Sequence, residues 1–243
     1  MKRKILAFAL VISMAVVAIA GASLAYLTDT DEQTNTFTSG KVDITLDEAK
    51  VVLDEDKYIK ETLKDRTSED QDYGKMYPGQ VITKDPTITV AADSEKAYVA
   101  AIITVSATDL QSLIGIEGTN LIDINKLASG GLMSGEAAAK ENHPLAGGAL
   151  PVFGNESYSI YQKNVDGAYV FYVFMEKIMA PGTAVTLFDT ITIPSEWDNA
   201  EMAKIVDLKI NVKAYAVQTQ TFDDCFDAMT TAFKDAFAFG NAQ

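Results

Sequence analysis

Residues that carry enzyme chemistry are scarce in this sequence of 243 residues. It contains one cysteine, Cys225, and one histidine, His143. A single cysteine cannot form an intramolecular disulfide, so the folded chain depends on burial or on assembly for its stability. One histidine and one cysteine cannot make a zinc site unless carboxylates supply the other ligands. A Ser-His-Asp triad would have to use His143, beside Pro144 in a loop.

Sequence motifs of catalysis and cofactor binding are also missing. The sequence has no HExxH, no GxSxG, no P-loop and no GxGxxG after a strand. We therefore expect no enzyme, no catalytic residue, no metal site and no cofactor. We interpret His143 as a solvated loop residue and Cys225 as a small buried apolar residue, with an intermolecular disulfide as the alternative.

Positive charge is in short supply. The chain has 20 basic and 34 acidic residues, a net charge of −14. Nucleic acids and anionic membranes both require clustered lysine and arginine, so neither is an expected partner. Acidic clusters lie at 29–32, 54–56 and 69–70, without the spacing of an EF-hand loop. We interpret them as solvated surface, which leaves weak Ca²⁺ binding open.

The N-terminus has the pattern of a signal peptide. Three basic residues follow Met1, an apolar run extends over 5–22, and Ser23 and Ala25 occupy the −3 and −1 positions of a cleavage site before Tyr26. We expect residues 1–25 to be removed and the mature chain to be secreted with a net charge of −17, since only basic charges are lost. The alternative is an uncleaved membrane anchor, because the apolar run is nearly long enough to span a bilayer. Membrane association is expected only for the uncleaved precursor.

Strand patterns dominate the rest of the sequence, with alternating or continuous apolar runs rich in β-branched and aromatic residues. The predicted strands are 41–46, 80–90, 97–105, 168–178, 185–193 and 205–217, with a short hairpin of 150–152 and 158–161. Pro86 within 80–90 implies an edge strand, a bulge or a break. Pro-Gly pairs at 78–79 and 181–182 predict type II turns before two of the strands. Strands in succession without regular βαβ alternation predict a mainly β fold, an antiparallel jelly-roll-like β-sandwich with short helices in its connections.

An amphipathic helix is predicted at the C-terminus. Its apolar stripe consists of Phe222, Phe226, Met229, Phe233 and Phe237. Thr221 is the expected N-cap and Gly240 the expected end. We expect this helix to cover the second face of an aromatic strand that contains Tyr169, Phe171, Tyr172 and Phe174. A partner-binding or membrane-surface helix is the alternative.

Three shorter helices are expected at 58–66, 121–127 and 136–142, the last two in a glycine-rich insertion near 108–150. The predicted organisation is a signal peptide over 1–25, an N-terminal segment over 26–40 and one β-sandwich domain over 41–243. Trp197, at a strand end, is expected to be a core or loop-anchoring residue rather than a platform for sugars.

Two segments carry a resemblance to a known family. The leader, followed by a T-F-x-x-G-x-[LV]-D motif, resembles the TasA/camelysin family, whose precursors are cut by a SipW-type signal peptidase. The matching motif residues are Thr36, Phe37, Gly40, Val42 and Asp43. A second match to a P-G-x-x-x-x-K segment consists of Pro78, Gly79 and Lys84. The segments 193–197 and 214–218 also resemble secreted relatives.

The resemblance implies a secreted fibre subunit of the extracellular matrix or surface of a Gram-positive-type bacterium. Its partner is a second copy in a head-to-tail polymer, or a homologous fibre protein, joined when the N-terminal stretch of one subunit adds as a strand to the next. Carried over to this sequence, the donated strand consists of Leu27, Thr28, Asp29, Thr30, Asp31, Thr34, Thr36 and Phe37.

Two other functions are weighed against the fibre subunit. One is a monomeric exported module that caps or anchors the fibres of another protein. The other is a secreted hydrolase, since camelysin was classed as a metalloprotease. Because nothing in this sequence supports a zinc site, we do not carry that activity over.

Overall fold

The structure, a computed structural model, describes residues 40–110, 150–154 and 158–238. The fold is mainly β, and every strand pairing is antiparallel, as predicted. The jelly-roll connectivity stays a prediction. In the described residues no helix is long and apolar enough to cross a membrane. The predictions for the signal peptide, the donated strand, the helices at 121–127 and 136–142, His143 and Gly240 concern residues outside the described ranges.

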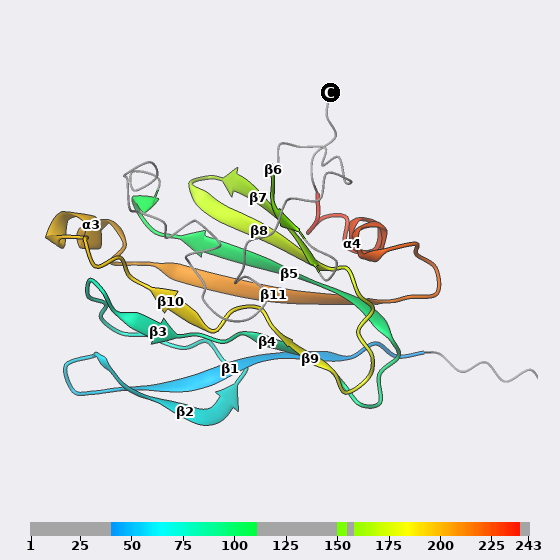
Figure 1. Cartoon of the computed structure of the whole chain (residues 1–243), viewed down its shortest axis with the longest axis horizontal. Helices are drawn as coiled ribbons and strands as arrows, with labels where there is room; N and C mark the ends of the chain where they lie inside the picture. Colours follow the sequence, from blue (N-terminus) through cyan, green and yellow to red (C-terminus); the bar gives the residue numbers. More distant parts are fainter. Residues whose placement is uncertain (1–39, 111–149, 155–157, 239–243) are drawn as a thin grey trace, which may run out of the picture. The chain divides into compact units, whose positions relative to one another are not determined.

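The larger sheet has five strands, two at its edges and three inside. Its order is β11 (Lys209–Gln218), β5 (Ala97–Ser106), β8 (Ala168–Met175), β7 (Tyr158–Val165) and β6 (Leu150–Gly154). Figure 1 shows β5, β8 and β7 side by side. The predicted central strand at 97–105 and the predicted hairpin of β6 and β7 are both confirmed.

A second sheet has four strands and is accompanied by a two-stranded pair. The sheet order is β2 (Ile59–Thr67), β1 (Ile44–Leu53), β4 (Thr87–Val90) and β9 (Ala184–Thr186), and the pair is β10 (Thr190–Thr192) with β3 (Val81–Thr83). A break at Pro86, one of the alternatives expected there, separates β3 from β4, because proline cannot donate to a strand ladder. Consequently β4 pairs with β1, while β3 pairs with β10.

Two apolar clusters lie on opposite faces of the larger sheet. The main cluster includes Phe171 and Val173 of β8, and the second includes Tyr172 and Phe174 of the same strand. Helix α4 (Cys225–Ala232) packs on the second face through Met229 and other apolar residues. The prediction that this helix covers the aromatic strand is therefore confirmed. Each large side chain buried in this way contributes about 1.5–3 kcal/mol of transfer free energy.

Both predicted Pro-Gly turns have the expected type II geometry. Gly79 has φ +77° and Gly182 has φ +75°, a region that side chains disfavour. In each turn the residue after glycine donates the hydrogen bond that closes the turn. Gln80 N donates to the Tyr77 carbonyl at 3.1 Å, and Thr183 N donates to the Ala180 carbonyl at 3.1 Å. These turns therefore fix the positions at which β3 and β9 begin.

The prediction of a helix over 58–66 is wrong, because this segment forms strand β2. It follows a tight turn in which Asp54 N donates to the Tyr58 carbonyl at 2.8 Å and Lys57 has φ +70°. The turn returns the chain alongside β1, and the ladder with β1 fixes the strand. The Glu, Lys and Leu of this segment favour a helix only weakly, so pairing overrides them.

Several predicted boundaries are also corrected. Strand β1 extends from Ile44 to Leu53 rather than over 41–46, because its second half pairs with β2. The predicted strand at 205–217 begins only at Lys209, and Val206, expected inside, is 80 % exposed. The predicted strand at 185–193 is two short strands, β9 and β10, and β8 ends at Met175.

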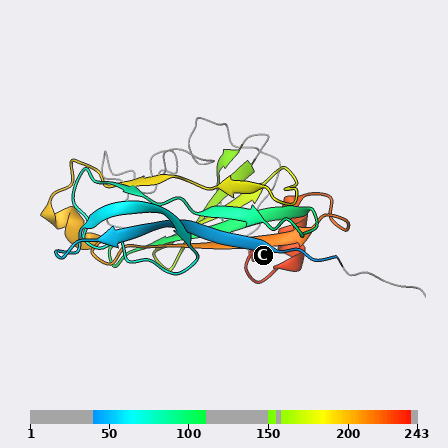
Figure 2. The same cartoon turned by 90° about the horizontal axis from the view of Figure 1, so that it is seen from below.

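The two helices differ from expectation at their starts. Helix α3 (Asn199–Lys204) was not predicted, although Asp198 and Glu201 form a capping box there. Helix α4 begins at Cys225 with Asp224 as its N-cap instead of Thr221. Both views place α3 and α4 at opposite ends of β11 (Figures 1 and 2).

Two single residues agree with their interpretation. The Cys225 thiol is buried and donates to the Val99 carbonyl at 3.2 Å, and burial strongly raises its pKa. Trp197 is buried in the main cluster. In the folded subunit, burial therefore opposes the intermolecular disulfide.

Candidate functional site

A cleft of about 470 Å³ lies where the two sheets approach each other. One side is formed by β1, by β3 and by the chain over 67–74 that follows β2. The other side is formed by the start of β11, where the consecutive residues from Leu208 to Val212 line it. Because successive residues of a strand point to opposite faces, a run of consecutive lining residues means that the edge of β11 itself borders the cleft.

A buried ion pair forms part of the β1 side. Lys84 Nζ lies 2.6 Å from Glu48 Oε2, and their side chains are 9 % and 14 % exposed. The same ammonium lies 4.9 Å from the centre of the Tyr73 ring. Burial and then the nearby Glu48 carboxylate raise the pKa of the Tyr73 hydroxyl, which stays neutral. Two charges in this setting are held by each other and by Gln71, whose amide donates to Glu48 at 3.1 Å.

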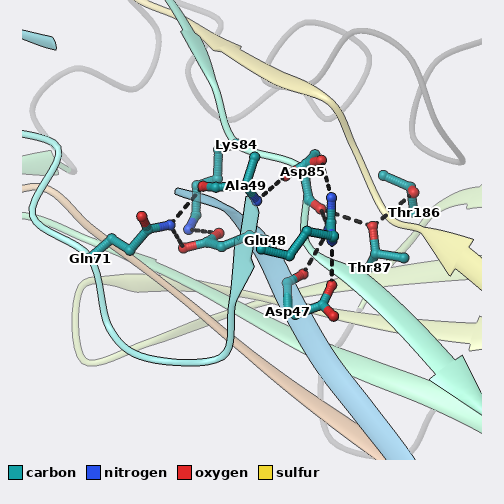
Figure 3. Close-up of polar contacts among 9 residues, drawn as sticks. Asp47, Glu48, Ala49, Gln71, Lys84, Asp85, Thr87 and Thr186 are labelled. Atoms are coloured by element: carbon teal, nitrogen blue, oxygen red, sulfur yellow. Dashed lines mark hydrogen bonds and ion pairs between the residues drawn. The ribbon is translucent and has the colours of Figure 1, made fainter. Parts of the chain in front are cut away.

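Side chains replace a missing strand beside the second half of β1. Asp47 lies opposite Thr87 of β4, so the same register would place Ala49 opposite Asp85. The chain turns away there, at Pro86. The Asp85 carboxylate instead accepts from Ala49 N at 2.7 Å, and Gln71 donates to the Ala49 carbonyl at 2.9 Å (Figure 3). Gln71 also accepts from Val51 N at 2.9 Å. The N–H groups of Ala49 and Val51 and the Ala49 carbonyl are therefore satisfied without another chain.

Arg66 of β2 binds both Asp47 of β1 and Asp85, the residue that bonds to Ala49 N. Its guanidinium donates to the Asp47 carboxylate at 2.6 Å and to the Asp85 carboxylate at 2.7 Å. It also donates to the Asp47 carbonyl at 3.1 Å and the Asp85 carbonyl at 2.9 Å. Partial burial lowers the pKa of the guanidinium, but the hydrogen bonds to the two carboxylates outweigh burial and raise it. One side chain thus ties β2, β1 and the turn before β4 together.

The resemblance motif does not converge on one site. Gly40, Val42 and Asp43 lie just before β1, where Asp43 N donates to Ser94 Oγ at 3.1 Å and Val42 packs on the main cluster. Pro78 and Gly79 form the turn before β3.

Lys84 is the one motif residue in the described part of the chain that lines the cleft. The sequence analysis missed its partner Glu48, and it also missed Arg66, Gln71 and Asp85. The sequence showed a lysine that could form an ion pair, but it did not show that Glu48 is its partner.

Other predicted site residues lie outside the described ranges. They are Ser23, Ala25 and Tyr26 of the cleavage site and all the residues assigned to the donated strand. In the described part of the chain, no group of three or more His, Cys, Asp or Glu side chains is arranged to hold a metal ion. The acidic residues at 54–56 belong to the β1–β2 turn, where Asp54 accepts from two backbone amides.

Comparisons with known proteins add one match. The model of the camelysin metallo-endopeptidase family matches residues 1–61, a range that contains the expected signal peptide, the following segment and β1. No curated protein and no solved structure is significantly similar to this chain. The match supports the camelysin/TasA assignment that the N-terminal motif indicated.

Proposed function

From the support for the camelysin/TasA family, we propose that this chain is a secreted structural protein, a subunit of extracellular matrix or surface fibres. A SipW-type signal peptidase removes residues 1–25. The segment from Tyr26 to Phe37 then adds as a strand to the sheet of another copy. The family match includes the leader and this segment, which supports a shared processing route.

The observation that carries the proposal is an open sheet edge at a cleft. Strand β11 pairs with β5 along its whole length, and no described strand pairs with its other side. The unpaired N–H and C=O groups of such an edge can be satisfied by an extended peptide. Because the donated segment and the accepting edge are different parts of the chain, the contact is head-to-tail, and it propagates unless the rotation between copies closes a ring. Repeated contacts of this kind produce a filament.

An alternative function is a monomeric accessory module that caps or anchors the fibres of another protein. The side chains of Gln71 and Asp85 favour it, because they satisfy β1 within one subunit. A subunit that does not need a donated strand to complete this part of its sheet can persist as a monomer. The secreted hydrolase is a weaker candidate, although the matching family carries the name metallo-endopeptidase.

The test is negative-stain electron microscopy of two chains, one starting at Tyr26 and one starting at Gly40. The second chain keeps the compact unit that begins at Gly40, so it is expected to fold. Fluorescence of the buried Trp197 verifies folding of both. We expect filaments from the first chain only, with pH and Ca²⁺ varied. Monomers from both would contradict the fibre subunit and support the accessory module.

A further inference from the structure

Strand edges differ in how much free backbone they offer. In the described sheets, the edges are β2, β9, β6 and β11, and the small pair adds β3 and β10. Strands β9, β3 and β10 have three residues each, too few for a stable ladder with another chain. Strand β6 contains Pro151, which has no N–H to donate. The gap beside β1 is occupied by Gln71 and Asp85.

Two long edges therefore remain, β2 and β11, and their regularity differs. The ladder of β11 with β5 has ten consecutive residue pairs from Lys209 opposite Ser106 to Gln218 opposite Ala97, without a bulge. The ladder of β2 with β1 has two register shifts. Because the ladder is unbroken, the N–H and C=O groups along the free edge of β11 keep a regular spacing that a new strand can pair with.

The two faces of β11 also offer different contacts. Ile210, Val212, Ala214 and Ala216 face the main cluster but stay only partly buried. A further strand beside them would cover apolar surface that the subunit alone leaves partly open. On the other face Lys209 and Lys213 are exposed.

Charge distinguishes the two edges. Strand β11 carries Lys209 and Lys213 and no acidic residue. Strand β2 carries Lys60 and Lys64 at the same spacing, but also acidic residues at 61 and 65, and its Arg66 is committed to Asp47 and Asp85. Asp207, just before β11, is bound to Thr108 at 2.6 Å and 2.8 Å through its two oxygens.

We propose that the free edge of β11 accepts residues 27–37 of a second copy of this chain, and that Lys209 and Lys213 select this acidic segment. The inference rests on the proposed function and names the accepting edge. The segment contains Asp29, Asp31 and Glu32 and no basic residue. In a strand Asp29 and Asp31 share one face, where direct or diagonal cross-strand contacts bring them to the two lysines. Glu32 and the threonines at 28, 30, 34 and 36 then share the opposite face, toward the partly open apolar side.

Charge reversal tests the acceptor. In a chain starting at Tyr26, the double variant Lys209→Glu and Lys213→Glu is expected to raise the critical concentration for filament formation about tenfold, because two attractive pairs become repulsive. The matched control is Lys60→Glu with Lys64→Glu, which reverses two lysines at the same spacing on β2. The control is expected to change the critical concentration by less than about twofold, because under the proposal β2 does not receive the acidic segment, and lysines without an ionic partner contribute little. Equal effects of the two double variants would overturn the proposal.

Rescue separates a specific contact from a general charge effect. Adding Asp29→Lys and Asp31→Lys to the β11 variant restores opposite signs, so filaments should return near the original critical concentration. The same two changes in an otherwise unaltered chain should impair assembly. If the rescue fails while all variants stay folded by Trp197 fluorescence, the segment does not pair with β11.

A binding measurement distinguishes failure of this inference from failure of the fibre function. The probe is a synthetic peptide of residues 26–38, added to the chain starting at Gly40, with hydrogen exchange read by mass spectrometry. We expect slower exchange over β11 and no change over β2, even if the chain never forms filaments. Filaments together with slower exchange over β2, or over neither edge, would overturn the β11 acceptor but leave the fibre subunit intact. No filaments and no slower exchange would contradict both.

Discussion

At the scale of single residues, Lys84 joins the sequence motif to the structure. Its ammonium is held between the Glu48 carboxylate and the Tyr73 ring, where water has little access. A lysine in such a place needs its partner, because an unpaired buried charge costs several kcal/mol. The motif lysine, which directly follows β3, therefore joins the end of β3 to β1 through its ion pair with Glu48 at the cleft.

Removing one member of the ion pair is expected to be far more costly than replacing both. Lys84→Met leaves the Glu48 carboxylate without its ammonium and should lower the free energy of unfolding by about 3 kcal/mol. The combined change Lys84→Met and Glu48→Leu removes both charges with little change of volume and should recover most of that loss. Urea unfolding followed by Trp197 fluorescence measures both. Additive losses in the double variant would show that the two charges do not depend on each other.

At the scale of elements, the start of β11 is fixed by one carboxylate. Asp207 accepts hydrogen bonds from the backbone N and the hydroxyl of Thr108, which follows β5. These two bonds hold the residues just before β11 against the chain that leaves β5. The hydrogen bonds from Thr108, hydroxyl first and then backbone, lower the pKa of Asp207 below 3.8. The folded state therefore binds this proton less readily than the unfolded chain does.

The pH dependence of stability follows from that sign. The contribution of Asp207 is fully present above the ordinary aspartate pKa of 3.8 and is lost as the pH falls through the lowered folded value. Asp207→Asn should remove this part of the acid dependence, so the urea midpoints of the two proteins should differ at pH 6 and converge at the lowest pH at which both stay folded. A constant difference at every pH would contradict the assignment.

Periodicity was sufficient for the elements whose burial follows their own pattern. The apolar run of β5 and the aromatic run of β8 were predicted as strands. A C-terminal helix over the second face of β8 was predicted from the spacing of four phenylalanines, although only Phe226 of these lies within α4. All three bury residues on two sides or in one stripe, so the side-chain pattern records the environment directly.

Elements defined by their neighbours were predicted less well. Strand β2 was taken for a helix because its residues are mostly exposed, and a strand with little burial has no distinctive apolar pattern. The second half of β1 was missed because β2 was not available to pair with it. The contacts of Gln71 and Asp85 with β1 could not be predicted from the sequence either. They form only because the chain turns away from β1 at Pro86 and leaves its backbone open to these side chains.

At the scale of the whole molecule, the proposed assembly has to bring together copies of the chain that repel each other. The chain carries a net charge of −14, and −17 once the expected signal peptide is removed. The proposed contacts between the donated segment and β11 join opposite charges a few ångströms apart, whereas the repulsion acts across entire subunits. Screening by salt weakens distant interactions far more than adjacent ones, with a Debye length of about 30 Å at 0.01 M and about 8 Å at 0.15 M.

Moderate salt is therefore expected to promote filament formation. For the chain starting at Tyr26, the critical concentration should fall when NaCl is raised from about 0.01 M to about 0.15 M, because repulsion between subunits is screened first. The variant Lys209→Glu with Lys213→Glu should gain from salt as well but remain the weaker assembler, since its local contact is repulsive. Sedimentation of filaments at a series of protein concentrations gives these values. A critical concentration that rises with salt would mean that the local ion pairs, and not the net charge, govern assembly.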